Sequence, residues 1–354
     1  VLIEERLNTY IEPIQETVLD RIADTGELIW RSERDGWGHY YLYASDGTLK
    51  GRITEGPWNA LRVAGIDEAG RALFFQAAGR EEGEDPYYLH LYRVSLDGTG
   101  LTLLNPGDFD HAAAMSESNR YFVDNFSRVN TVPKSELRDR NGNVVLELEE
   151  ADLSLLMAAG YQWPEPFTVK AGDGVTDLYG VMYKPFDLDE TQRYPLIEYV
   201  YPGPQTEAVT KAFSGRAQNV HLAQMGFIVI EIGNRGGHPY RSKWYHNYGY
   251  GNLRDYGLAD KKTAIEQLAA RHDFIDLDRV GIFGHSGGGF MSTAAMLVYP
   301  DFFKVAVSSS GNHENQIYNR YWSEKHHGVK ETTDDEGNIT FEYDIDKNSE
   351  LAKN

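Results

Sequence analysis

The segment RVGIFGHSGGGFMSTAAMLVY, residues 279–299, decides the fold. Its first part predicts a buried strand, and the part after Gly287 predicts a helix. Ser286 lies at the junction, between Gly284 and Gly288, in the pattern G-x-S-x-G. A strand that turns this sharply into a helix brings together the positions two before and two after the serine, so both favour glycine. We therefore predict a strained turn with Ser286 at a helix N-terminus, where backbone N–H groups favour developing negative charge.

The sequence around this turn alternates between strand and helix patterns from residue 167 onward. Residues 167–171 and 178–185 predict an entry hairpin. Continuous apolar runs predict buried strands at 196–201, 227–232, 279–284 and 304–309. Residues 256–274 have the apolar spacing of a crossover helix. This alternation predicts a parallel sheet covered by helices.

The preceding part, from about residue 12 to 150, consists of short strand-like runs separated by turns. The hairpin turns Asp46-Gly47, Asp97-Gly98 and Asn141-Gly142 recur at intervals of about 40–50 residues, with four strands expected in each repeat. Such a period is typical of propeller blades; a β-sandwich of hairpins is the alternative. About three blades are visible, whereas closed propellers have about four to eight, so we expect the chain to begin partway round the propeller.

Composition limits the classes of function. The chain has 354 residues, 41% of them hydrophobic, which is enough for two domains with packed cores. Its formal charge of −20 argues against binding to nucleic acid, which requires a basic face. No apolar stretch is long enough for a membrane helix. Cysteine is absent, and the histidines at 238, 246 and 272 follow no metal-ligand spacing, so we predict no metal or other cofactor.

The motifs EYVYPGP (198–204), GNRGG (233–237) and GHSGGG (284–289), in this order after a propeller-like region, resemble the prolyl oligopeptidase family of serine peptidases, nearest its dipeptidyl peptidase IV branch. The resemblance implies blades of a β-propeller over residues 1–155. It implies an α/β-hydrolase domain over residues 156–354, which lacks its last strands. The stretch ADLSLLMAAGYQWPEP, with two prolines, marks the expected boundary.

The resemblance also assigns roles to residues. Ser286 would be the acylated nucleophile, and the Gly287 N–H and the Tyr201 hydroxyl would stabilise the oxyanion. Tyr318 and Trp322 would line the pocket for the residue before the cleaved bond, on one face of a helix turn. Three alternatives stay open: Tyr321 could replace them in a shifted register, the aromatic pair could simply pack in a helix core, and Tyr201 could simply close a strand end.

Two positions depart from the pattern of the branch. Gly287 stands where an aromatic residue is usual, and Trp322 stands where a tyrosine is usual. The preference among proline, alanine and bulkier residues is therefore left open.

Arg235 borders the site in relatives, with a structural role as the alternative. Glu81 and Glu82 are expected in a solvated loop rather than as the pair that binds a substrate amine, and residues 334–338 are expected in a hairpin turn rather than a calcium loop.

The acid and histidine of a Ser-Asp-His triad are not evident after Ser286. His313, His326 and His327 all precede the later acids Asp334, Asp335, Asp344 and Asp346, and His285 should point away from the serine hydroxyl. A parallel sheet that ends at 304–309 would also leave an unpaired edge. We therefore expect the triad acid and base, and further strands, beyond Asn354, with residues 344–354 as a helical lead-in. By this interpretation the chain alone is not a competent hydrolase.

These observations favour a serine peptidase that cleaves short peptides after proline or a small residue through an acyl-enzyme on Ser286. The alternatives are an esterase or acylaminoacyl hydrolase and a catalytically silent propeller scaffold. The expected partner is a peptide substrate, and the branch makes a homodimer the expectation. Acidity and the habits of the branch favour an exported, periplasmic or extracellular setting, although the sequence does not establish localisation.

Overall fold

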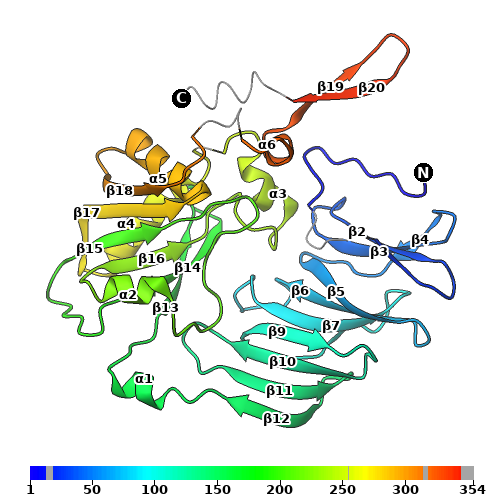
Figure 1. Cartoon of the computed structure of the whole chain (residues 1–354), viewed down its shortest axis with the longest axis horizontal. Coiled ribbons are helices and arrows are strands. Elements are labelled where there is room, and N and C mark those ends of the chain that lie inside the picture. Colours follow the sequence, from blue (N-terminus) through cyan, green and yellow to red (C-terminus); the bar gives the residue numbers. More distant parts are fainter. Residues whose placement is uncertain (13–18, 254, 314–317, 344–354) are drawn as a thin grey trace.

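The structure is a computed structural model that describes residues 1–12, 19–253, 255–313 and 318–343, in two parts that lie side by side (Figure 1). The N-terminal part contains antiparallel sheets, and the C-terminal part contains a mixed sheet with helices. Residues 344–354, for which the sequence predicts a helical lead-in and which include Asp344 and Asp346, lie outside the described residues.

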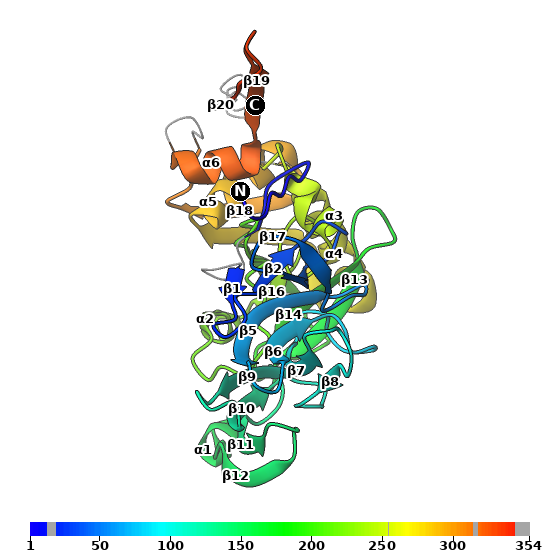
Figure 2. The ribbon, with the colours of Figure 1, turned by 90° about the vertical axis from the view of Figure 1, so that its right-hand side faces the viewer.

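The N-terminal part holds three sheets of four consecutive strands each. The first contains β1 (Leu19–Arg21), β2 (Leu28–Ser32), β3 (His39–Tyr43) and β4 (Leu49–Arg52). The second contains β5 (Asn59–Asp67), β6 (Ala72–Ala78), β7 (Leu89–Ser95) and β8 (Thr102–Leu103). The third contains β9 (Asp110–Met115), β10 (Tyr121–Ser127), β11 (Lys134–Asp139) and β12 (Val144–Glu150). Figure 2 shows the sheets following one another along the molecule.

The predicted hairpin turns occupy the same place in each sheet, between the third and fourth strands. Gly47, Gly98 and Gly142 have φ values of 88°, 85° and 87°. This left-handed conformation is the one that glycine adopts without strain, so the turn predictions are confirmed. The three sheets fit the propeller part of a propeller-plus-hydrolase fold.

The C-terminal part is built on a six-stranded sheet with the order β13-β14-β16-β15-β17-β18. Its strands are β13 (Glu165–Lys170), β14 (Asp177–Tyr183), β15 (Tyr194–Tyr199), β16 (Ile228–Ile232), β17 (Ile275–His285) and β18 (Phe303–Ser309). The pairs β13·β14 and β14·β16 are antiparallel, and β16, β15, β17 and β18 are parallel. The entry hairpin and the four predicted strands are therefore confirmed.

Helices precede, join and follow these strands (Figure 1). They are α1 (Ser154–Ala158), α2 (Gln218–Ala223), α3 (Lys243–His246), the 3-10 helix η1 (Asn247–Gly249), α4 (Leu258–Arg271), α5 (Gly287–Val298) and α6 (Arg320–His327). A hairpin of β19 (Val329–Thr333) and β20 (Ile339–Tyr343) follows α6 and projects from the body. Its turn lies at residues 334–338, as predicted.

The C-terminal part has a hydrophobic core formed by the sheet and its helices. Leu196, Ile230 and Ile282 from the sheet pack with Ile265 of α4 and Ala295 of α5, all almost fully buried. Burial of such side chains is the main favourable term in folding.

Among the described residues β18 is an edge strand, and its Val305 and Val307 are 62% and 59% exposed.

The order of the parallel strands places β15 beside β17. Parallel neighbours end at the same edge of a sheet, so the residues that follow β15 lie next to those that follow β17. The predicted strand 196–201 ends earlier than expected, at Tyr199, which leaves Tyr201 in the loop after β15. Both Tyr201 and Ser286 therefore lie at one sheet edge.

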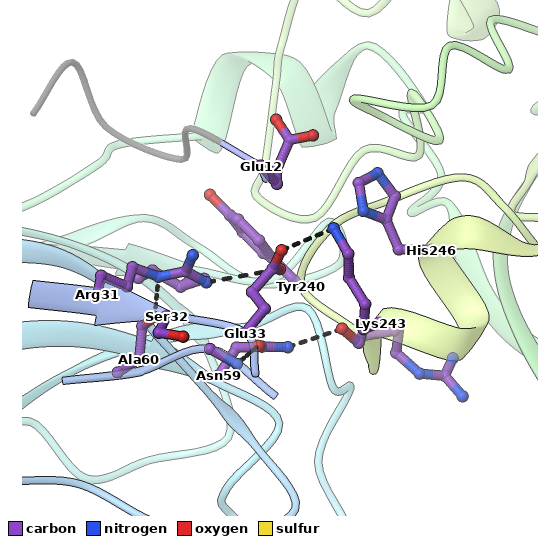
Figure 3. A network of polar contacts seen from close by, with 12 residues as sticks. Glu12, Arg31, Ser32, Glu33, Asn59, Ala60, Tyr240, Lys243 and His246 are labelled. Atoms are coloured by element: carbon purple, nitrogen blue, oxygen red, sulfur yellow. Dashed lines mark hydrogen bonds and ion pairs between the residues drawn. The ribbon is translucent and has the colours of Figure 1, made fainter. Parts of the chain in front are cut away.

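Polar contacts join the two parts (Figure 3). Lys243 of α3 pairs with Glu33, which follows β2, at 2.7 Å, and its backbone N–H donates to the Gly36 carbonyl at 2.8 Å. The Asn59 side chain donates to the Arg241 carbonyl at 2.8 Å. Glu33 and Lys243 are 4% and 11% exposed at their side chains. A buried pair of this kind fixes the relative placement of its two elements, because breaking it would leave an uncompensated buried charge.

No helix among the described residues has the length and apolar character needed to cross a membrane.

Acid pH tests the burial of His246 at this interface. Burial, and then nearby Lys243, lowers the pKa of His246 to about 4. The unfolded chain binds a proton at His246 below a pH of about 6.5, whereas the folded protein does not until about pH 4. The contribution of His246 to stability is thus complete above about pH 6.5 and decreases as the pH falls toward 4, by on the order of 3 kcal/mol.

We therefore expect the unfolding free energy of the wild type to fall more steeply than that of His246→Gln between pH 7 and 4.5, measured by urea unfolding. Burial raises the pKa of Glu207 and gives an opposite slope, so the comparison is between variants rather than of absolute slopes. His221→Gln, at an exposed histidine, is the control. Parallel curves for wild type and His246→Gln would contradict the expectation.

Candidate active site

Ser286 occupies a strained turn between β17 and α5. Its φ and ψ angles are 56° and −117°, and it is the N-cap residue of α5. This φ is uncommon for a residue with a side chain. The Ser286 N–H donates to the Ser309 carbonyl at 2.8 Å, and the Phe290 N–H donates to the Ser286 carbonyl at 3.0 Å. Neighbouring β18 and the first turn of α5 thus hold the strained backbone in place.

The flanking glycines are required by close contacts with the end of β15. A Cβ atom on Gly284 would lie 2.2 Å from the Val200 carbonyl oxygen and 2.7 Å from the Gly288 Cα. A Cβ atom on Gly288 would lie 2.0 Å from the same oxygen and 3.5 Å from the Tyr201 Cα. The missing side chains therefore allow the turn to lie directly against Val200 and Tyr201.

Gly287 differs from these two glycines. A Cβ atom placed there would meet nothing within 4 Å. Its N–H belongs to the first turn of α5, where a helix offers no acceptor of its own. No steric contact therefore requires glycine at position 287. As the first residue of α5, Gly287 has its N–H at a helix N-terminus, where an anion is favoured.

One cavity of about 100 Å³ brings the predicted site residues together. Ser286, Gly287, Tyr201, Tyr318 and Trp322 all line it. The other lining residues are Pro202, Gly203, Pro204, Gln205, Leu253, Phe290 and Asn312. Two of these could have been found from the sequence: Phe290 lies one helical turn after Ser286, and Asn312 follows the carboxyl end of a predicted strand.

The aromatic wall of the cavity is formed by Tyr318 and Trp322. Their ring centroids are 5.3 Å apart and the rings are almost perpendicular, at 89°. The prediction that both lie on one helix turn was wrong, because α6 begins at Arg320 and Tyr318 precedes it. The alternative residue Tyr321 is 83% exposed and is not part of the lining.

The loop that carries Tyr201 is anchored by a buried carboxylate. Glu207 accepts a hydrogen bond from Tyr87 of the N-terminal part at 2.8 Å and another from Tyr245. It also accepts one from the His238 N–H at 3.3 Å. Burial raises the pKa of Glu207, against the hydrogen bonds from the two tyrosines, which lower it. The N-terminal part thus helps to fix the loop beside Ser286.

The nearby histidines do not reach the serine hydroxyl. His285 contacts the Ser309 hydroxyl at 2.9 Å through Nδ1, and it is exposed. His326 is buried against Trp322, and burial, together with nearby Lys325, lowers its pKa to about 2. Across the described ranges, no hydrogen bond joins the Ser286 hydroxyl to a histidine or a carboxylate. Among the described residues, Ser286 therefore has no hydrogen-bonded side chain that could act as a general base.

Arg235 and Glu81 lie outside this cavity. The Arg235 guanidinium pairs with Asp260 at 2.7 Å and Asp173 at 3.1 Å, so its role in the structure is to join these carboxylates. Glu81 accepts hydrogen bonds from Arg80 and the Tyr92 hydroxyl.

Two family models and several known proteins match this chain. Residues 1–133 match the model for the dipeptidyl peptidase IV N-terminal region, and residues 212–347 match the model for the prolyl oligopeptidase family. Human dipeptidyl peptidase 8 is 32% identical over 274 residues, which are 73% of this chain and 30% of that protein. Dipeptidyl peptidase 4 of Trichophyton rubrum is 23% identical over 308 residues, 83% of this chain and 38% of that protein.

A solved structure has the same fold. Dipeptidyl peptidase 4 of Porphyromonas gingivalis superposes with a TM-score of 0.80 at 24% identity, covering 91% of this chain and 44% of that one. The chain spans about a third of the length of the curated relatives that it matches, at 30% and 38%.

Glycine substitutions test the turn. We expect Gly288→Ala to lower the unfolding free energy by about 1–3 kcal/mol, because its Cβ must displace the Val200 carbonyl. Gly287→Ala should leave stability unchanged or raise it by about 0.5–1 kcal/mol, because its Cβ enters open space. Urea unfolding of the two variants and the wild type measures the difference. Equal stability of the two variants would show that the predicted crowding is absent.

Proposed function

Because this chain belongs to the prolyl oligopeptidase family, in its dipeptidyl peptidase IV branch, we propose that it forms part of a serine peptidase that acts on short peptides. In this proposal residues 1–155 are blades of a β-propeller and residues 156–354 belong to the α/β-hydrolase domain. The reaction is cleavage after proline or a small residue through an acyl-enzyme on Ser286.

The observation that carries the proposal is the strained turn at Ser286 with φ of 56°, at the head of α5 and open to the cavity. A hydroxyl held in this way is exposed to a substrate carbonyl while the adjacent N–H groups face the oxygen of that carbonyl. A glycine-rich turn without chemistry would not need Tyr201 and Trp322 around the same cavity.

The proposed reaction follows from these positions. The Ser286 oxygen attacks the carbonyl carbon of the substrate, and the carbonyl oxygen becomes an oxyanion. The Gly287 N–H and the Tyr201 hydroxyl donate hydrogen bonds to that oxyanion, which has its full charge only in the tetrahedral intermediate. The amine leaves with a proton, and water then hydrolyses the acyl-enzyme. A histidine outside the described residues would accept the serine proton and an acid would orient it.

The same cavity supports a preference for a small or cyclic residue. Tyr318 and Trp322 form a right-angled aromatic corner, at 89°, against which a flat proline ring can pack. A Cβ atom on Gly287, which also lines the cavity, would enter open space, at the position where the branch usually has an aromatic residue. We infer that the cavity accepts residues other than proline more readily than a site closed by two aromatic walls.

We further propose, on the habit of the branch, that the full-length protein is a homodimer; sedimentation analysis tests this.

Labelling with an alkyl fluorophosphonate tests the nucleophile. The full-length wild type should be labelled on Ser286, and Ser286→Ala should abolish labelling because it removes the hydroxyl that the reagent would modify. Ser309→Ala, which removes the neighbouring hydroxyl on β18 but keeps the backbone that holds Ser286, should be labelled normally. Equal labelling of Ser286→Ala and wild type, by mass spectrometry, would exclude the proposed chemistry.

Hydrolysis of a dipeptide amide tests the second oxyanion donor. Tyr201→Phe should lower kcat by about 10²- to 10³-fold with little change in KM, since its hydroxyl would act mainly in the transition state. Tyr199→Phe is the matched control, because this tyrosine of β15 packs on Phe283 and does not line the cavity. An unchanged kcat for Tyr201→Phe would remove this residue from the mechanism.

A further inference from the structure

Helix α6 carries Trp322 into the cavity, and its last turn is fixed to the rest of the protein by residues far away in the sequence. The His326 carbonyl accepts a hydrogen bond from the Gly251 N–H at 3.0 Å. Lys325 pairs with both carboxylate oxygens of Glu12, at 3.0 and 2.8 Å. Both figures of the whole chain show residues 1–12, the N-terminal segment, beside α6 (Figures 1 and 2).

Tyr10 lies at the centre of these contacts. Its ring meets the ring of His326 edge to face, with centroids 5.1 Å apart. It also lies under the ammonium group of Lys325, 5.0 Å from the ring centroid. On the other side, its hydroxyl lies 3.2 Å from His246 Nε2, and its carbonyl accepts from Lys243 Nζ at 2.7 Å. Tyr10 therefore touches both α6 and α3.

The ring contacts continue to the cavity. Trp322 packs against His326, one helical turn later, with ring centroids 4.9 Å apart, and against His327 at 5.9 Å. Tyr10, His326 and Trp322 thus form a continuous row of rings from the N-terminal segment to the cavity wall. A change at Tyr10 is transmitted through packed side chains, which have little room to adjust.

The Glu12–Lys325 pair differs from a second ion pair in the same region. Glu12 is 6% exposed at its side chain and Lys325 is 25% exposed. Arg6 and Glu331, which also join the N-terminal segment to the chain after α6, are 57% and 43% exposed. Solvent and salt screen the exposed pair, which contributes little, whereas the partly buried pair is screened less, so removing the Glu12 charge leaves Lys325 without its carboxylate partner. Of these two pairs, Glu12–Lys325 is the one that lies next to the rings behind Trp322.

The N-terminal segment is in turn fixed to the first sheet. Lys243, which holds the Tyr10 carbonyl, also pairs with Glu33 after β2 at 2.7 Å. Figure 3 shows Glu12, Glu33, Lys243 and His246 converging on one region between the two parts of the molecule. The position of α6 therefore depends on contacts with the N-terminal part as well as on the sheet that precedes Ser286.

From these contacts we propose that Tyr10 and Glu12 are positioning residues: through His326 and Lys325 they hold α6 in place and so set the distance between Trp322 and Ser286. The inference rests on the proposed peptidase function for its consequence, which is the preference for the residue before the cleaved bond. Loosening α6 allows Trp322 to move away, and the packing around a proline ring is lost before that around an alanine methyl group.

The test uses the full-length protein and two chromogenic dipeptide amides, one with proline and one with alanine before the cleaved bond. Glu12→Gln keeps the shape of the side chain but removes its charge, and Tyr10→Leu removes the ring. Each should lower the proline-to-alanine ratio of kcat/KM by about tenfold, mainly through KM for the proline substrate. Glu12→Asp and Tyr10→Phe, which keep the charge and the ring, should restore most of the ratio.

Glu331→Gln is the matched control, because it breaks an exposed ion pair of the same N-terminal segment that does not reach Trp322. It should leave the ratio within about twofold of the wild type. A lowered ratio in Glu331→Gln equal to that in Glu12→Gln would overturn the proposal, since the effect would then be general loosening.

Hydrogen exchange of the peptide 318–327 separates this proposal from the proposed function. Glu12→Gln and Tyr10→Leu should exchange faster there than the wild type and Glu331→Gln, whether or not the protein hydrolyses either substrate. If no substrate is cleaved and Ser286 is not labelled, the proposed function fails and the exchange result alone decides the positioning. Unchanged exchange overturns the positioning of α6; faster exchange with an unchanged ratio overturns its effect on the cavity.

Discussion

The site depends on one close approach, that of the turn around Ser286 to the carbonyl at the end of β15. Gly284 and Gly288 both face the Val200 oxygen at distances that leave no room for a side chain. This contact allows β17 to bend directly into α5 and forces the serine backbone to a φ of 56°. The strained backbone is maintained because the Ser286 N–H is hydrogen-bonded to β18 and the Ser286 carbonyl to α5. The same contact places Tyr201 beside Ser286, so the proposed nucleophile and a proposed oxyanion donor follow from a single packing constraint.

The remaining walls of the cavity come from elements that no local rule brings together. Loop 202–208 is held by Glu207, whose partners include Tyr87 of the N-terminal part. Helix α6 is held by Tyr10 and Glu12, which precede the first sheet. Charged groups buried at these contacts lose hydration, so they contribute orientation more than net stability. The sheets of the N-terminal part therefore act on the site by fixing loops and a helix, even though Ser286 follows β17 of the six-stranded sheet.

Local features of this arrangement could be predicted from the sequence. Gly47, Gly98 and Gly142 marked the hairpin turns because only a few residue types adopt their φ values, and Gly284 and Gly288 marked the turn around Ser286 for a steric reason. Tyr318 and Trp322 were found by resemblance, yet the helix that was expected to hold both begins only at Arg320. The contact between Glu12 and Lys325, 313 residues apart, carries no periodic signal and could not be predicted. Phe290 was missed although its helical spacing from Ser286 indicated it.

A crystal structure of the full-length protein phosphonylated at Ser286 tests the central claim most directly, because the adduct imitates the tetrahedral intermediate. The account predicts that φ of residue 286 stays positive. It also predicts that a phosphonyl oxygen accepts hydrogen bonds from the Gly287 N–H and the Tyr201 hydroxyl, with the adduct facing Trp322. A relaxed backbone at residue 286, or an adduct whose oxygen points to solvent away from both donors, would contradict it.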